Sequence, residues 1–174
     1  MHLAYMNFRS GFAPRSILSL TLAAILLAAA TAAAWQYALP PSKLYTDNTY
    51  RFSLLIPAAF TVAEGAEIDS DASTTILLQN GVGDGVQILI SPWDEPATAL
   101  TPERITHDTG LTVTDPQPIN IQGATGIMFR NDNSGFDGAA SDAWFVSRGN
   151  IYQLSTYARD DAVLKNMLAS WTFF

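Results

Sequence analysis

The chain of 174 residues contains no cysteine. Disulfide bonds, thiolate nucleophiles, a lipid-modified cysteine and cysteine-ligated zinc or iron–sulfur sites are therefore excluded. Without disulfides, the fold has to be held together by its own hydrophobic core. Apolar residues make up 48% of the sequence, which suffices for such a core and argues against a disordered chain.

Basic side chains are scarce, with nine Lys and Arg against sixteen Asp and Glu, for a formal net charge of −7. Two of them, Arg9 and Arg15, precede a long apolar run that contains no acidic residue. The other seven are scattered singly, at Lys43, Arg51, Arg104, Arg130, Arg148, Arg159 and Lys165. Because a polyanion needs a basic patch, we exclude nucleic acid as a partner.

Residues that carry catalysis are also few. The two histidines, His2 and His107, fall on opposite sides of the apolar run, and no serine lies in a G-x-S-x-G motif. Neighbouring carboxylates occur at residues 94–95 and 160–161. In an extended chain such side chains point apart, and at a helix start they complement the helix dipole. We therefore predict no enzymatic activity and no cofactor.

An apolar run near the N-terminus is long enough to cross a bilayer as a helix. We predict a transmembrane signal-anchor over residues 16–37, with a basic cytoplasmic tail over residues 1–15 and the rest of the chain outside. A cleaved signal peptide is the alternative, because Ala32–Ala34 offers a small-residue cleavage site, and it predicts a secreted or periplasmic protein. Residues 38–49 contain two prolines and predict a linker.

Residues 50–174 are predicted to form one domain with an antiparallel sheet. Strand-like runs cover 50–57, 60–65, 74–80, 86–93, 124–132 and 143–158, and the last is a hairpin around Gly149-Asn150. Residues 111–123 indicate extended chain broken by Pro116 and Pro118.

Two helices complete the predicted domain. Over residues 101–110, Thr101 suits a cap, Pro102 the first turn and Gly110 the end. Near the C-terminus, an apolar stripe indicates a helix that packs on the core, formed by Leu164, Met167, Leu168 and Trp171.

The most polar stretch, residues 130–145, contains Asp132, Asp137 and Asp142 around two glycines. These carboxylates are weak candidates for a cation site, because neither reading frame fits the spacing of an EF-hand loop. An exposed connection between two strands explains the same composition. Phe136 in this loop and Trp93 after a strand are weak candidates for contacts with a partner.

Several segments resemble the PsbP/Mog1-like family, in this order along the chain: "YRFSLLIPAAFTV", "GATGIMF", "AWFVSRGNIYQLSTYA" and "LKNMLASWTFF". The resemblance covers about residues 44–174 and rests on positions that shape the fold. It implies an α+β fold, an α/β/α sandwich around a central, mostly antiparallel sheet. It also implies a non-enzymatic assembly factor, extrinsic subunit or adaptor.

Together, these features predict an extracytoplasmic binding or assembly module, tethered to the bilayer by its N-terminal helix and accessory to a membrane or envelope complex. A protein partner is expected there. The alternative is an exported protein that binds a small ligand or a divalent cation. A pocket with converging polar groups would favour a ligand, an exposed apolar patch an assembly role, and two facing carboxylates a hydrolase.

Overall fold

The computed structural model describes residues 41–64, 73–81, 83–132 and 138–174. The cytoplasmic tail predicted over residues 1–15 and the transmembrane segment predicted over residues 16–37 lie outside the described residues. Within the described ranges, no helix has the length and apolar character needed to cross a membrane. The residues from Pro41 to Phe174 form one compact unit.

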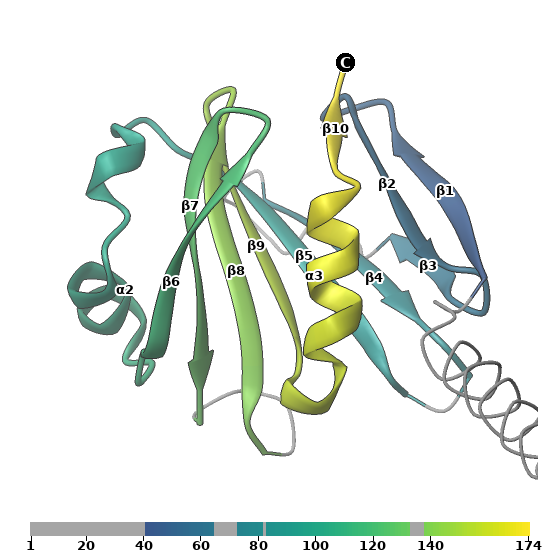
Figure 1. Ribbon diagram of the computed structural model, residues 1–174. Helices are drawn as coiled ribbons and strands as arrows, with labels where there is room; N and C mark the ends of the chain where they lie inside the picture. Colours follow the sequence, from purple (N-terminus) through teal and green to yellow (C-terminus); the bar gives the residue numbers. More distant parts are fainter. Residues whose placement is uncertain (1–40, 65–72, 82, 133–137) are drawn as a thin grey trace, which may run out of the picture. The chain divides into compact units, whose positions relative to one another are not determined.

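A seven-stranded sheet forms the centre of this unit, with strand order β3-β4-β5-β9-β8-β7-β6. Every pair of neighbours in it is antiparallel. Its strands are β3 (Thr61–Glu64), β4 (Thr74–Gln79), β5 (Gly85–Pro92), β6 (Thr114–Ile121), β7 (Ala124–Asn131), β8 (Ala140–Ser147) and β9 (Asn150–Tyr157). Figure 1 shows β6 and β7 at one side of the sheet and β3 at the other. The predicted antiparallel sheet is confirmed.

A second sheet has three strands, in the order β1-β2-β10. They are β1 (Ser42–Asp47), β2 (Phe52–Pro57) and β10 (Thr172–Phe173). The linker predicted over residues 38–49 is therefore wrong for its second half, because residues 42–47 form β1. All six of these residues pair with β2, and Tyr45 is buried, so the strand is fixed by partners that local sequence does not reveal.

Two local predictions need correction. The β8–β9 turn consists of Arg148 and Gly149, with φ of 52° and 75°, rather than Gly149 and Asn150. Asn150 instead begins β9, pairs with Ser147 and donates from Nδ2 to the Arg148 carbonyl at 3.2 Å. Residues 114–121 form the strand β6 despite its two prolines, because Pro118 lies on an edge strand and Pro116 lies in a bulge between Thr114 and Gln117.

The face of the large sheet that carries α3 (Asp161–Ala169), here called the α3 face, packs on the main core. The predicted stripe is confirmed, since Leu164, Met167, Leu168 and Trp171 are all buried. Trp171 stacks on Phe52 of β2 with 4.2 Å between ring centroids. The helix thus joins the large sheet to the small one (Figure 1).

The opposite face, here called the α2 face, carries α2 (Pro102–Thr109) and a smaller core. Ile105 of α2 packs there on residues from β7, β8 and β9, namely Ile127, Phe129, Trp144 and Ile151. The predicted start and end of this helix are confirmed. Thr101 Oγ1 accepts from the Arg104 N–H at 3.3 Å, and Gly110 ends the helix with a φ of 72°.

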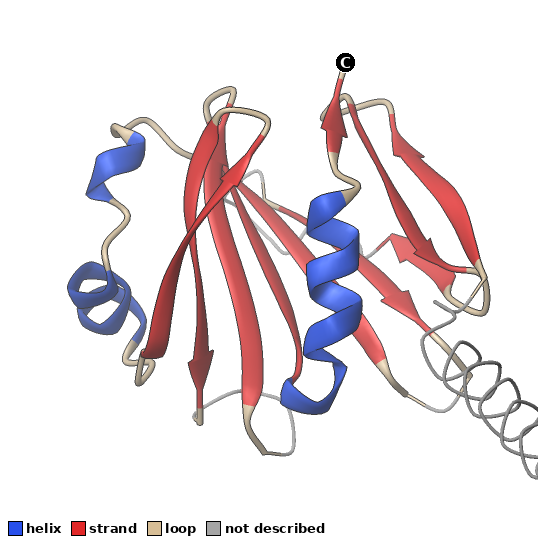
Figure 2. Ribbon diagram, in the orientation of Figure 1, coloured by secondary structure: helices blue, strands red, loops and turns tan. Residues whose placement is uncertain are grey.

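Helices are few in this fold, as Figure 2 shows. The described residues contain two α-helices, of eight and nine residues, and two 3₁₀ turns, at Ala97–Ala99 and Ala158–Asp160. The architecture is therefore α+β, dominated by antiparallel strands, with one helix on each face of the large sheet.

Candidate functional site

The candidate cation ligands are not brought together. Asp132 is exposed just beyond the end of β7, and Asp142 is buried within β8. Asp137, and with it the candidate contact residue Phe136, lies outside the described residues. Among the residues that are described, no group of three or more acidic, histidine or cysteine side chains has the arrangement to hold a metal ion.

Asp142 is instead the centre of a buried polar cluster on the α2 face. Its two carboxylate oxygens accept hydrogen bonds from Asn131 Nδ2 and from Ser155 Oγ. Burial raises the pKa of Asp142 to about 6, against the opposing effect of these hydrogen bonds. Asn131 Oδ1 is buried and has no hydrogen-bond partner among the described residues. Burial thus outweighs the two hydrogen bonds in setting the pKa of this carboxyl.

Trp93 is half-buried and packs against the smaller core. The guanidinium of Arg104 lies 5.4 Å from the centroid of its ring, within the range of a cation–π contact. Arg104 also forms ion pairs with Glu95 and Asp108. The Trp93 ring is thus engaged within the domain. His107 is exposed on α2 and interacts with Asp108 at 2.8 Å.

Side chains gather around a groove that runs between β6–β7 and α3, which we call the β6–α3 groove. It consists of two hollows of about 470 and 360 Å³ that share Gln117, Met128 and Lys165. The first is also lined by Asp115, Arg130 and Asp161, and the second by Ile119, Ile121, Leu168, Ala169 and Trp171. One end of the groove is therefore charged and the other is mostly apolar.

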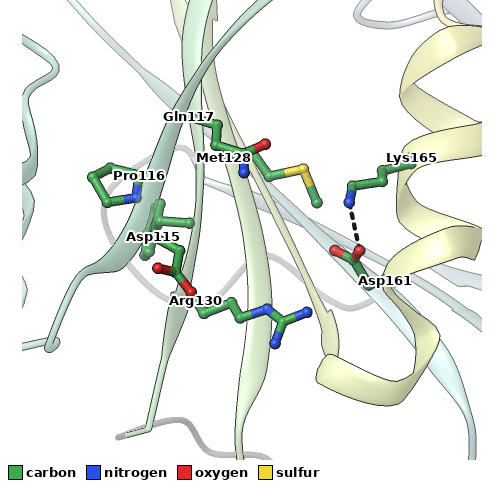
Figure 3. Close-up of a pocket in the computed structure, with 8 residues that line it drawn as sticks. Asp115, Pro116, Gln117, Met128, Arg130, Asp161 and Lys165 are labelled. Atoms are coloured by element: carbon green, nitrogen blue, oxygen red, sulfur yellow. Dashed lines mark ion pairs between the residues drawn. The ribbon is translucent and has the colours of Figure 1, made fainter.

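The charged end is shown in Figure 3. Lys165 and Asp161 form an i,i+4 ion pair on α3, with 2.7 Å between Nζ and Oδ2. Across the groove, Arg130 extends from β7 and Asp115 from β6. Asp115 has a φ of 50° where the β6–β7 register shifts, and aspartate tolerates this left-handed conformation better than most residues. The bulge redirects the backbone next to the groove.

The apolar end is backed by the main core. Ile121, Leu168 and Trp171 are buried, whereas Ile119 is half-buried on the edge strand. The turn after β6 is fixed to β10, because Gln122 Oε1 accepts from the Phe173 N–H at 2.8 Å. This end is thus held by contacts between elements far apart in the chain.

Sequence reasoning did not find this groove. It identified Arg130 and Lys165 only as isolated basic residues, and Asp161 as a carboxylate at a helix start. The available signal was the pair of prolines in extended chain, which is typical of an edge strand. The meeting of that edge with α3 depends on tertiary packing.

The large exposed apolar side chains among the described residues are Leu44, Leu55, Val62 and Phe174. Leu44 and Leu55 are directly paired across β1 and β2, with 66% and 44% of their surface exposed. Two leucines form a small patch, so the groove is the more developed surface feature.

No family model matches the chain, and no curated protein matches it. Solved structures do. A solution structure of cyanobacterial PsbP (CyanoP) from Synechocystis sp. PCC 6803 matches with a TM-score of 0.54 and 10% identity, over 79% of this chain and 95% of that one.

Two further matches are more distant. A crystal structure from Bacteroides thetaiotaomicron has a TM-score of 0.47 and 11% identity, over 76% of this chain and 48% of that one. A protein of unknown function from Pseudomonas aeruginosa, PA94, has a TM-score of 0.40 and 15% identity, over 71% and 91%. The likeness to CyanoP shows that the chain has a PsbP-like fold.

Proposed function

We propose that the chain is a non-catalytic binding module, accessory to a membrane or envelope complex, and that it binds its partner through the β6–α3 groove. The observation that carries this proposal is the charged end of the groove. There Asp115 and Arg130 lie in one hollow, and neither side chain has an ion-pair partner among the described residues. Charges left unpaired beside an open groove are available to a partner.

The arrangement of titratable groups supports binding rather than catalysis. His107 lies on α2, on the face of the sheet away from the groove. Of the two carboxylates in the groove, Asp161 is held by Lys165. A glycoside hydrolase needs two carboxyl groups facing each other across the substrate, and this pairing removes one of them.

No observation favours the alternative of a divalent-cation protein. Both carboxylate oxygens of Asp142 are occupied by donors from the protein. The groove also suits a small ligand less well. Pockets for small ligands bury most of the ligand, whereas Asp115, Gln117 and Arg130 are all exposed and would leave it open to solvent.

The sequence supports a proposal for the location of the module. We propose that residues 16–37 anchor it in the bilayer and that residues 41–174 act outside the cytoplasm, since Arg9 and Arg15 precede the apolar run. The order of motifs, together with the PsbP-like fold, supports membership of the PsbP/Mog1-like family. Members of that family are mostly assembly factors, extrinsic subunits or adaptors.

Site-specific photo-crosslinking in cells tests this proposal. A photoreactive amino acid replaces Gln117, exposed in the groove, or Thr106, exposed on α2, in the full-length chain. We expect one reproducible covalent adduct from position 117, none from position 106, and loss of the adduct when Arg130→Glu is added. Equal labelling from both positions, or no adduct from position 117, would contradict the groove as the binding surface.

A further inference from the structure

Among the described arginines, only Arg51 and Arg130 have side chains without a hydrogen bond or ion pair to another described residue, and of these two Arg130 lines the groove. Arg104 and Arg159 are held by carboxylates, and Arg148 Nη1 donates to the Phe174 carbonyl at 2.9 Å. Arg130 is exposed, and its side chain forms no hydrogen bond or ion pair with any described residue. Asp115, in the same hollow, also has no ion-pair partner among the residues that the structure describes.

The charged and apolar ends of the groove are separated by a distance that follows from the strand pairing. Arg130 lies opposite Thr114, and Gly126 lies opposite Ile119, so the charged and apolar ends are four positions apart along β7. Four extended residues span about 13 Å. Ile119 and Leu168 line the apolar end, with Met128 between the two ends. An extended segment with an acidic side chain and an apolar one four residues away matches both ends.

The prolines of β6 decide how such a segment can dock. Pro118 lies opposite Ile127 in the regular part of the ladder, whereas Pro116 lies in the bulge between Thr114 and Gln117. Since β6 stays paired with β7 at Pro118, the N–H group that this proline lacks belongs to the outer edge of the sheet. A strand added to this edge would lack the backbone donor at Pro118 and would meet the irregular backbone of the bulge. Binding by side chains in the groove is therefore favoured over extension of the sheet.

We propose that the β6–α3 groove binds an extended polypeptide segment, in which an acidic side chain pairs with Arg130 and an apolar side chain four residues away packs on Ile119 and Leu168. This inference rests on the proposed function and names the chemistry of the partner. The residues of the bound segment between its acidic and apolar side chains would pass over Met128 and Lys165, where the groove sets few requirements on their sequence.

An array of synthetic nonapeptides, probed with the labelled full-length chain, tests this. The third position is glutamate or lysine, the seventh is leucine or serine, and the others are mixtures of threonine, serine and glycine. We expect peptides with glutamate and leucine to bind at least about tenfold more strongly than those with lysine or serine, the size of one good charge-assisted contact. Arg130→Glu should reverse the preference from glutamate to lysine, which a misfolded variant could not do.

Lys43→Glu is the matched control, because it makes the same charge change at an exposed position of β1 and should leave the preference intact. Equal binding of glutamate and lysine peptides, or a preference unchanged by Arg130→Glu, would overturn the inference. So would saturable binding of dodecyl phosphate without any peptide preference, since the groove would then hold a small amphiphile. If position 117 crosslinked a partner but the array showed no peptide preference, the proposed function would stand and this inference would be wrong.

Discussion

Among the described residues, the core on the α3 face of the large sheet contains twenty buried hydrophobic residues, whereas the α2 face carries a separate cluster of five. The larger cluster joins both sheets and α3 through stacked and edge-to-face aromatic rings. The smaller one lies beside a buried carboxyl, Asp142, with its polar partners. Stability should therefore come mainly from the α3 face, and sensitivity to pH from the α2 face.

The largest expected effect on stability is at Trp171, in the core of the α3 face. It is 3% exposed and packs on Phe52, Phe145 and Tyr152. Trp171→Ala should lower the free energy of unfolding by about 3–5 kcal/mol, because it removes buried area and leaves a cavity. Urea titration followed by circular dichroism measures the loss. Trp171→Phe, which keeps a ring for stacking, should cost clearly less, and a loss below about 1 kcal/mol for the alanine variant would place the main core elsewhere.

The second prediction concerns Asp142, whose pKa is raised to about 6 by burial, from the usual 3.8. A carboxyl with a raised pKa stabilises the fold when protonated, and this contribution is lost as the pH rises through 6. Between about pH 4 and pH 7 it should fall by about 2–3 kcal/mol, since each pKa unit corresponds to roughly 1.4 kcal/mol. Urea titrations across this range should show the fall in the wild type and not in Asp142→Asn.

Asp94→Asn provides the control for Asp142, since Asp94 is exposed in the loop after β5. Its pH profile should follow that of the wild type. If Asp142→Asn and the wild type also kept parallel profiles, the buried cluster would not be the source of the pH dependence.

The smallest expected effect lies at the start of α2. Thr101→Ala removes the hydroxyl that accepts from the Arg104 N–H at 3.3 Å, and it should cost about 0.5–1 kcal/mol. Hydrogen exchange should then quicken in α2 and not in α3. Thr106→Ala, exposed on the same helix, should be neutral or slightly stabilising, because alanine favours helix. Equal losses from both changes would argue against capping.

Local signals explain what the sequence predicted. The cap, proline and glycine that bound α2 act within ten residues, and the α3 stripe follows from helical spacing. The prediction of a linker was wrong for residues 42–47, because these residues pair with β2 although their mostly polar composition does not indicate a strand. The groove could not be predicted, since Asp115, Arg130 and Lys165 come from three elements that only the packing of α3 brings together.

The order of the small sheet has a consequence for how the chain is made. Strand β2 lies between β1, its neighbour in sequence, and β10, whose residues come about 120 positions later. Phe52, Leu54 and Ile56 of β2 belong to the same core as Trp171. During synthesis, therefore, the first hairpin emerges with its apolar side uncovered and stays so until the end of the domain arrives. Bringing β10 to β2 closes a long loop, which is slow and entropically costly. The small sheet is therefore completed only after β10 has been synthesised.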